Sequence, residues 1–175
     1  MRRFLCAAVW ACSIAQAQAQ TATQDIIISA IVNGACTIDN VATGPADTAT
    51  IVINANGSVN TTPVTPTNAP YANVACNGPS QLQLTSLSGG VLNGAAAAGF
   101  QNIINYTASA TWNSVTANVN TSTVPTATGP EAGAAQPVAT AFIGSLSVTI
   151  TPIANTLPLV KGAYTDTLRV TLTPN

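Results

Sequence analysis

The side chains that most often carry chemistry are few in this sequence and do not cluster. It contains no histidine, and its acidic residues are four aspartates and one glutamate. No two carboxylates lie close enough along the chain to suggest a glycosidase pair or a calcium-binding loop. Lys161 precedes a glycine in a predicted turn, where we expect a solvated charge. We therefore expect no enzyme activity, no catalytic residue, no metal site and no bound cofactor.

Charge is scarce over the whole chain. Only 4 Lys+Arg and 5 Asp+Glu occur among 175 residues, which is 5%, against about 25% in a typical soluble protein. The polar residues are instead mainly 26 threonines and 16 asparagines. Without a basic patch the sequence argues against a nucleic-acid partner. Its length fits one domain with a real core.

Residues 1–19 have the layout of a secretory signal peptide. Arg2 and Arg3 supply the positive start, residues 4–14 are apolar, and overlapping Ala-x-Ala sites permit cleavage after Ala17 or Ala19. The apolar stretch is too short to span a bilayer. Twin-arginine export and lipoprotein attachment fit these residues less well. We expect export by the signal peptide, with no membrane insertion of the mature chain.

The cysteines divide between this leader and the rest of the chain. Cys6 and Cys12 leave with the signal peptide, so the mature chain keeps Cys36 and Cys76. A single pair in an exported protein indicates a disulfide, and two buried free thiols are the less favoured alternative in an oxidising compartment.

Apolar residues alternate with polar ones in most segments after residue 20, and no segment has the pattern of an amphipathic helix. Alternation with a period of two is typical of strands with one buried face. Turn-forming residues separate these segments, which predicts an antiparallel β-sandwich of about seven strands. We expect loops at 56–70 and 121–137 and a possible helical turn at 95–98. The expected strands include 26–32, 51–53, 82–87, 102–112, 113–119, 142–151 and 164–173.

Two features at the chain ends suggest more than a self-contained sandwich. The segment 20–32 is apolar and alternating, with one face formed by Ile26, Ile28, Ala30 and Val32. It is either the first strand of the sandwich or a strand donated to the sheet edge of another molecule. The last predicted strand runs nearly to Asn175, which is consistent with a sandwich that lacks its final strand and contains an open groove.

The C-terminal residues resemble those of a known family. The motif Gly162-x-Tyr164-x-Asp166-x-Leu168-x-Val170-x-Leu172 is similar to the C-terminal signature of spore coat protein U domain proteins. That family includes the archaic (Csu-type) chaperone–usher pilins. The N-terminal spacing is also similar, with Asn33-Gly-Ala followed by Cys36-Thr-Ile. The stretch from Tyr106 to Trp112 departs from the family pattern, because it lacks a second tyrosine and an aspartate.

The resemblance implies an incomplete immunoglobulin-like antiparallel β-sandwich that is completed by donor-strand exchange. The organisation would be a signal peptide (1–19), an N-terminal donor-strand segment (20–33) and a pilin-like domain (34–175). Its partners would be homologous pilin subunits, a periplasmic chaperone and an outer-membrane usher. The product would be a cell-surface fibre serving adhesion or biofilm formation.

A second hypothesis comes from a different functional class. The chain would be a self-contained secreted β-sandwich that binds a carbohydrate or a surface partner, and it would keep 20–32 in its own sheet. An exported hydrolase is a third and poorly supported possibility, because the sequence lacks the residues for it.

Overall fold

The computed structural model describes residues 23–44, 46–123 and 129–175, so the predicted leader lies outside the described residues. The chain divides after Val32 into two units. Every named strand belongs to the unit that begins at Asn33, and their pairing is antiparallel throughout. The prediction of an all-β, antiparallel fold is therefore confirmed.

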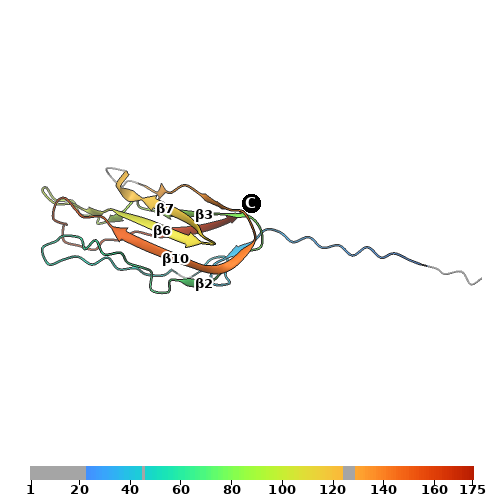
Figure 1. Cartoon of the computed structure of the whole chain (residues 1–175). Helices are drawn as coiled ribbons and strands as arrows, with labels where there is room; N and C mark the ends of the chain where they lie inside the picture. Colours follow the sequence, from blue (N-terminus) through green and yellow to red (C-terminus); the bar gives the residue numbers. More distant parts are fainter. Residues whose placement is uncertain (1–22, 45, 124–128) are drawn as a thin grey trace, which may run out of the picture. The chain divides into compact units, whose positions relative to one another are not determined.

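The larger sheet has five strands in the order β1-β2-β10-β6-β7 (Figure 1). Strand β10 lies at its centre and bends at an irregularity between Gly144 and Leu146. The hairpin between β6 and β7 turns through Asn113 and Ser114, which both have positive φ, as a two-residue turn between twisted strands requires. The strands are β1 (Cys36–Thr37), β2 (Tyr71–Cys76), β6 (Tyr106–Trp112), β7 (Val115–Asn120) and β10 (Phe142–Pro152).

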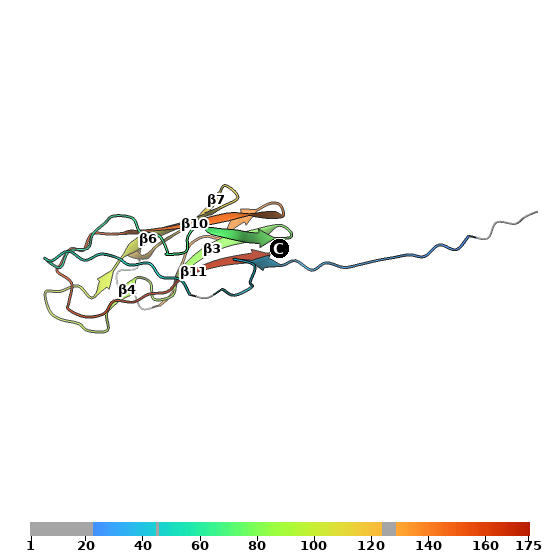
Figure 2. The same ribbon diagram turned by 90° about the horizontal axis from the view of Figure 1, so that it is seen from below.

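The second sheet packs against the first, and Figure 2 shows the two layers edge-on. Its long strand β3 pairs on one side with β11 and on the other with the short β8 and β9. A two-stranded sheet of β4 and β5 lies beyond it. These strands are β3 (Ser80–Ser86), β4 (Val91–Leu92), β5 (Ile103–Ile104), β8 (Glu131–Ala132), β9 (Gln136–Val138) and β11 (Leu168–Pro174), and a 3-10 turn covers Thr121–Thr123.

The core lies between these sheets and follows from the alternation of the strands. In β3, Leu82 and Leu84 are fully buried, whereas Gln81 is exposed and Gln83 is half-buried. Trp112 is also fully buried; its indole N–H donates to the carbonyl of Val74, and its ring meets that of Phe142 edge-on at 5.4 Å. Each such apolar side chain contributes roughly 1.5–3 kcal/mol by leaving water.

Several expected elements differ in the structure. Residues 51–53 form only an isolated bridge, Ile53 to Val59, and not a strand. The region 121–137 is not a plain loop, because the short strands β8 and β9 cover the free edge of β3 there. Residues 95–98 form no helical turn. Strand β2 was not expected, since its run of small and polar residues alternates weakly.

The predicted disulfide between Cys36 and Cys76 is confirmed. The two residues are direct partners in the ladder between β1 and β2. The bond therefore ties the start of the domain to an inner strand of the larger sheet.

We expect Cys36→Ser to lower the free energy of unfolding by about 4 kcal/mol, because a loop spanning 40 residues of sequence is no longer closed in the unfolded chain. Urea denaturation would measure this loss. Reduced wild-type protein is the control and should unfold at a similar midpoint. A variant as stable as the oxidised wild type would contradict the structural role of the bond.

Candidate functional site

The last strand of the domain has one unpaired edge. Among the described residues β11 pairs with β3 alone, although its inward side chains are apolar. Leu168, Val170 and Leu172 contact the core but stay only half-buried. An uncovered edge carries backbone N–H and C=O groups that are ready to pair with a further strand. Among the described residues, this sheet therefore ends at β11.

A groove of about 1220 Å³ runs along this open edge. Its floor includes core residues of the larger sheet such as Leu146, Val148 and Ile150, and one side is formed by residues 162–172. The segment 46–53 also lines the groove, yet it forms no named strand. Such a long, mainly apolar trough between two sheets suits an extended peptide rather than a compact small molecule.

The polar residue of the C-terminal motif, Asp166, is held by a hydrogen-bond network. Its carboxylate accepts hydrogen bonds from the hydroxyls of Ser86 and Tyr106, both at 2.6 Å, and from the backbone N–H groups of Ser88 (3.0 Å) and Thr167 (2.7 Å). Burial, together with the hydrogen bond to Asp166, raises the pKa of the Tyr106 phenol above its ordinary value. This network fixes the chain just before β11.

The other motif residues lie at the far end of the groove. The hydroxyl of Tyr164 donates to the carbonyls of Gln101 and Val160, each at 3.0 Å. Gly162 has a φ of 151°, and a side chain there would collide with Asn93, so only glycine fits this position. The structure therefore brings all six predicted motif residues, Gly162 to Leu172, into the lining of one groove.

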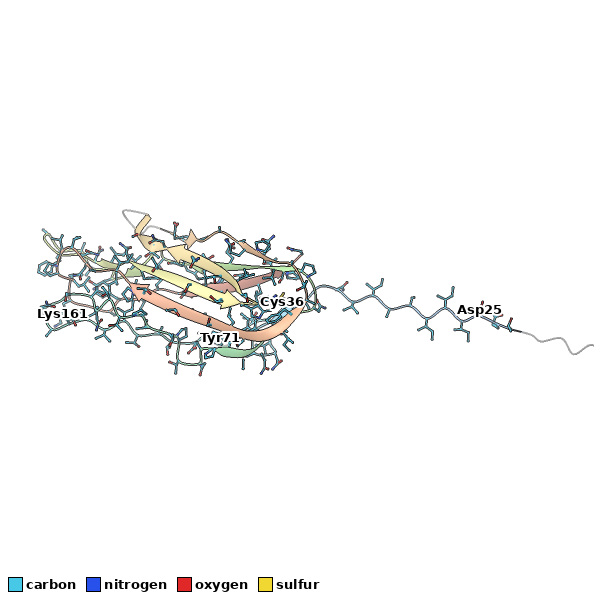
Figure 3. All side chains as sticks on the ribbon, viewed as in Figure 1. Asp25, Cys36, Tyr71 and Lys161 are labelled. Atoms are coloured by element: carbon cyan, nitrogen blue, oxygen red, sulfur yellow. A yellow bond between two sulfur atoms is a disulfide. The ribbon has the colours of Figure 1, made fainter. Side chains whose placement is uncertain are left out.

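The predicted donor-strand residues lie in the other unit, of which residues 23–32 are described. They form no strand, and their side chains are exposed on both faces: Ile26 is 82% exposed and Ile28 is 92% exposed. Ala30 and Val32 are exposed as well. Figure 3 shows the side chains around Asp25 pointing to alternate sides of an extended backbone. Large apolar side chains left in water along one segment indicate a binding function.

The segment 46–53, which forms one wall of the groove, is anchored by Asp47, which the sequence predicts only as a turn-capping residue. The Asp47 carboxylate accepts hydrogen bonds from the backbone N–H groups of Thr48 (2.7 Å) and Asn68 (2.9 Å) and from the Tyr71 hydroxyl (3.0 Å). Burial acts to raise the Asp47 pKa, but these hydrogen bonds outweigh it and hold the pKa below its ordinary value. Burial and the bond to Asp47 raise the pKa of Tyr71 to about 12.

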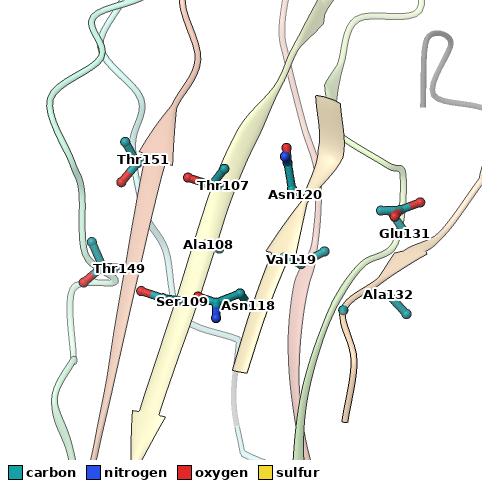
Figure 4. Close-up of a pocket in the computed structure, with 11 residues that line it drawn as sticks. Thr107, Ala108, Ser109, Asn118, Val119, Asn120, Glu131, Ala132, Thr149 and Thr151 are labelled. Carbon is teal, nitrogen blue, oxygen red and sulfur yellow. The ribbon is translucent and has the colours of Figure 1, made fainter. Parts of the chain in front are cut away.

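A second, smaller hollow of about 450 Å³ lies on the outer face of the larger sheet (Figure 4). The ladder registers bring three rows of uncharged polar side chains together across β10, β6 and β7. Glu131 lies at its rim, and Gly133 is pressed so closely onto the backbone of Asn118 that no side chain fits there. The rows are Ser147/Thr111/Thr116, Thr149/Ser109/Asn118 and Thr151/Thr107/Asn120.

Within the part of the chain that the structure describes, no group of three or more potential metal ligands lies together. The same residues contain no helix long and apolar enough to cross a membrane. Comparison with protein-family models, with curated proteins and with solved structures finds no match. The family resemblance remains a prediction from the motifs of this chain.

We expect Asp47→Asn to loosen the groove wall. Because the folded-state pKa of Asp47 lies below 3.8, its stabilisation is present above that pH and is lost as the pH falls through the folded value. The protection factors of the Thr48 and Asn68 amides against hydrogen exchange should therefore fall in strong acid for wild type, whereas in the variant they should be low at every pH.

The pKa of Tyr71 gives an independent measurement in the same Asp47→Asn variant. Titration of Tyr71 followed by NMR should show its pKa falling from about 12 towards the ordinary value near 10. Asp39→Asn, which removes a carboxylate that only acts on Tyr71 through space, is the matched control and should have a small effect. If the pKa of Tyr71 is unchanged in Asp47→Asn, Asp47 does not hold segment 46–53 through its hydrogen bond to Tyr71.

Proposed function

We propose that this chain is a structural subunit of a secreted surface fibre, assembled by donor-strand complementation in the manner of archaic chaperone–usher pilins. The observation that carries the proposal is the groove beside the unpaired edge of β11. An immunoglobulin-like sandwich that lacks its last strand would have such a groove. Leu168, Val170 and Leu172 are then half-buried because the strand that would cover them comes from another molecule.

The segment 20–33 is the proposed source of that strand. Its even-numbered positions from Ile26 to Val32 are all apolar, while the alternate positions mix Asp25 and Ser29 with Ile27 and Ile31. In an extended strand these sets face opposite sides. The apolar set would enter the groove of a second subunit, and main-chain hydrogen bonds to β11 would supply affinity.

This contact joins two different surfaces, the segment of one subunit and the groove of the next. A contact of that kind does not close on itself, so repetition produces a filament. Before assembly, a periplasmic chaperone would cover the groove, and an outer-membrane usher would exchange the chaperone for the next subunit. Adhesion or biofilm formation would be the role of the finished fibre.

We expect Ile28→Asp to abolish polymerisation while leaving the subunit folded. The variant would place an unpaired carboxylate in the groove of a neighbour, which costs several kcal/mol, but its own groove and core are unchanged. Electron microscopy and size-exclusion chromatography would score assembly, and thermal unfolding would score the fold.

Ile27→Asp is the matched control for this variant. It adds the same charge one residue away, on the opposite face of the strand, so its effect on assembly should be milder. If Ile28→Asp instead destabilises the isolated subunit, the segment belongs to its own sheet and the proposal is wrong. Stable monomers with residues 20–32 protected from protease would also contradict it.

The outer hollow favours a second candidate, the binding of a neutral carbohydrate. The side chains of Thr107, Ser109, Asn118, Thr149 and Thr151 make no hydrogen bond within the described residues. Their hydroxyl and amide groups are therefore available to sugar hydroxyls.

Binding of neutral oligosaccharides by the intact protein would test this candidate. Gly133→Ala should reduce such binding, because a methyl group there displaces the residues at the rim of the hollow. The comparable Gly78→Ala is the control, since nothing lies within 4 Å of its added methyl group. If the wild-type protein binds no neutral oligosaccharide, carbohydrate binding at the outer hollow is contradicted.

A further inference from the structure

Asparagine followed by glycine occurs four times after the predicted leader, at 33–34, 56–57, 77–78 and 93–94. In such a pair the backbone nitrogen of the glycine can attack the asparagine side chain, because no Cβ on the glycine obstructs the approach. The attack requires that the side-chain amide is free to reach this nitrogen and that the glycine N–H is not bound elsewhere. The hydrogen bonds of the structure distinguish the four pairs by these two conditions.

The pair at 56–57 meets neither condition. The amide oxygen of Asn56 accepts hydrogen bonds from the backbone N–H of Ser58 at 3.0 Å and from the hydroxyl of the same residue at 2.7 Å. These bonds form an Asx turn, so the side chain is not free to rotate toward the nitrogen of Gly57. The Gly57 N–H itself donates to the carbonyl of Asn54 at 2.9 Å. This pair is therefore protected while the turn is intact.

Two further pairs have a restrained asparagine. The amide oxygen of Asn77 accepts a hydrogen bond from the N–H of Ala35 at 2.7 Å, and its amide nitrogen donates to the carbonyl of Asn33 at 2.9 Å. Asn93 is only 7% exposed, and its amide oxygen accepts a hydrogen bond from the N–H of Ala95 at 2.9 Å. Both side chains would have to break these contacts, through a local opening of the domain, before they could react.

The pair Asn33–Gly34 meets both conditions. Both residues are exposed, and in the part of the chain that the structure describes the Asn33 side chain makes no hydrogen bond and the Gly34 N–H has no acceptor. Asn77 holds the main-chain carbonyl of Asn33, which leaves the side chain free to rotate. We propose that Asn33 is a site of spontaneous modification, at which asparagine converts to aspartate and isoaspartate. This proposal is independent of the donor-strand function.

The reaction needs no reagent other than water. The backbone nitrogen of Gly34 loses its proton to solvent and forms a bond to Cγ of Asn33, while the Cγ–Nδ2 bond breaks and the amide nitrogen takes a proton from solvent and leaves as ammonia. The product is a cyclic imide, which water then opens at either of its carbonyls. Opening at Cγ gives aspartate in a normal backbone. Opening at the main-chain carbonyl gives isoaspartate, in which the backbone runs through Cβ and Cγ.

Either product changes the chain where the segment 20–33 joins the domain. Each product adds a negative charge at residue 33. In isoaspartate the main-chain carbonyl that accepts a hydrogen bond from Asn77 becomes a free carboxylate, and the link to Gly34 gains a methylene group. The hydrogen bond from Asn77 then no longer restrains the path of the backbone. Modification at Asn33 would therefore loosen the attachment of the segment to the domain.

Peptide mapping by mass spectrometry tests the proposal. The folded mature chain is incubated in mildly alkaline buffer, and conversion of each asparagine in the four pairs is followed with fragmentation that distinguishes isoaspartate from aspartate. Asn33 should convert faster than the other three asparagines, on the order of tenfold or more, because those three must first be released by local opening. In concentrated urea with a reductant the four rates should become similar, since each asparagine precedes a glycine.

Two variants, each replacing an exposed side chain, serve as controls. Asn33→Gln should remove the rapid conversion, because glutamine would have to close a larger and less favourable ring. Asn56→Gln makes the same change at a protected pair and should leave the rapid conversion as it is in wild type. Conversion of any of the other three asparagines as fast as Asn33 in the folded chain would overturn the proposal, and so would conversion of Asn33 in urea alone.

Discussion

The unpaired edge of β11 is the constraint on which the rest of the structure depends. Backbone N–H and C=O groups beside an apolar groove are unfavourable unless another strand or water satisfies them. Three features hold the chain around this edge. Asp166 fixes the residues just before β11, and Gly162 permits the turn that precedes them. The disulfide ties Cys36 to β2 of the larger sheet.

The scarcity of charge is consistent with this arrangement. A subunit with 5% charged residues has little electrostatic means of choosing partners. In the proposed assembly, the shape of the groove and the apolar alternation of the donated strand would therefore supply most of the affinity.

Sequence patterns predicted the parts of the fold in which local chemistry decides the outcome. Leu82 and Leu84 alternate with glutamines, so β3 was predictable, and the pairing of Cys36 with Cys76 followed from their being the only cysteines after the leader. Strand β2 was missed because the ladder to β10 defines it, and Ile53 was wrongly assigned to a strand because only an isolated bridge to Val59 pairs it. Asp47 was predictable as a turn cap, but its anchoring of the groove was not, since its partners Asn68 and Tyr71 are distant in sequence.

Hydrogen exchange along β11 tests the central claim most directly. The amides of residues 168–173 that point away from β3 should exchange rapidly in the isolated full-length subunit and become strongly protected when subunits assemble. Protection of the same amides in the isolated subunit, or their continued rapid exchange within an assembled fibre, would contradict the claim that another copy supplies the missing strand.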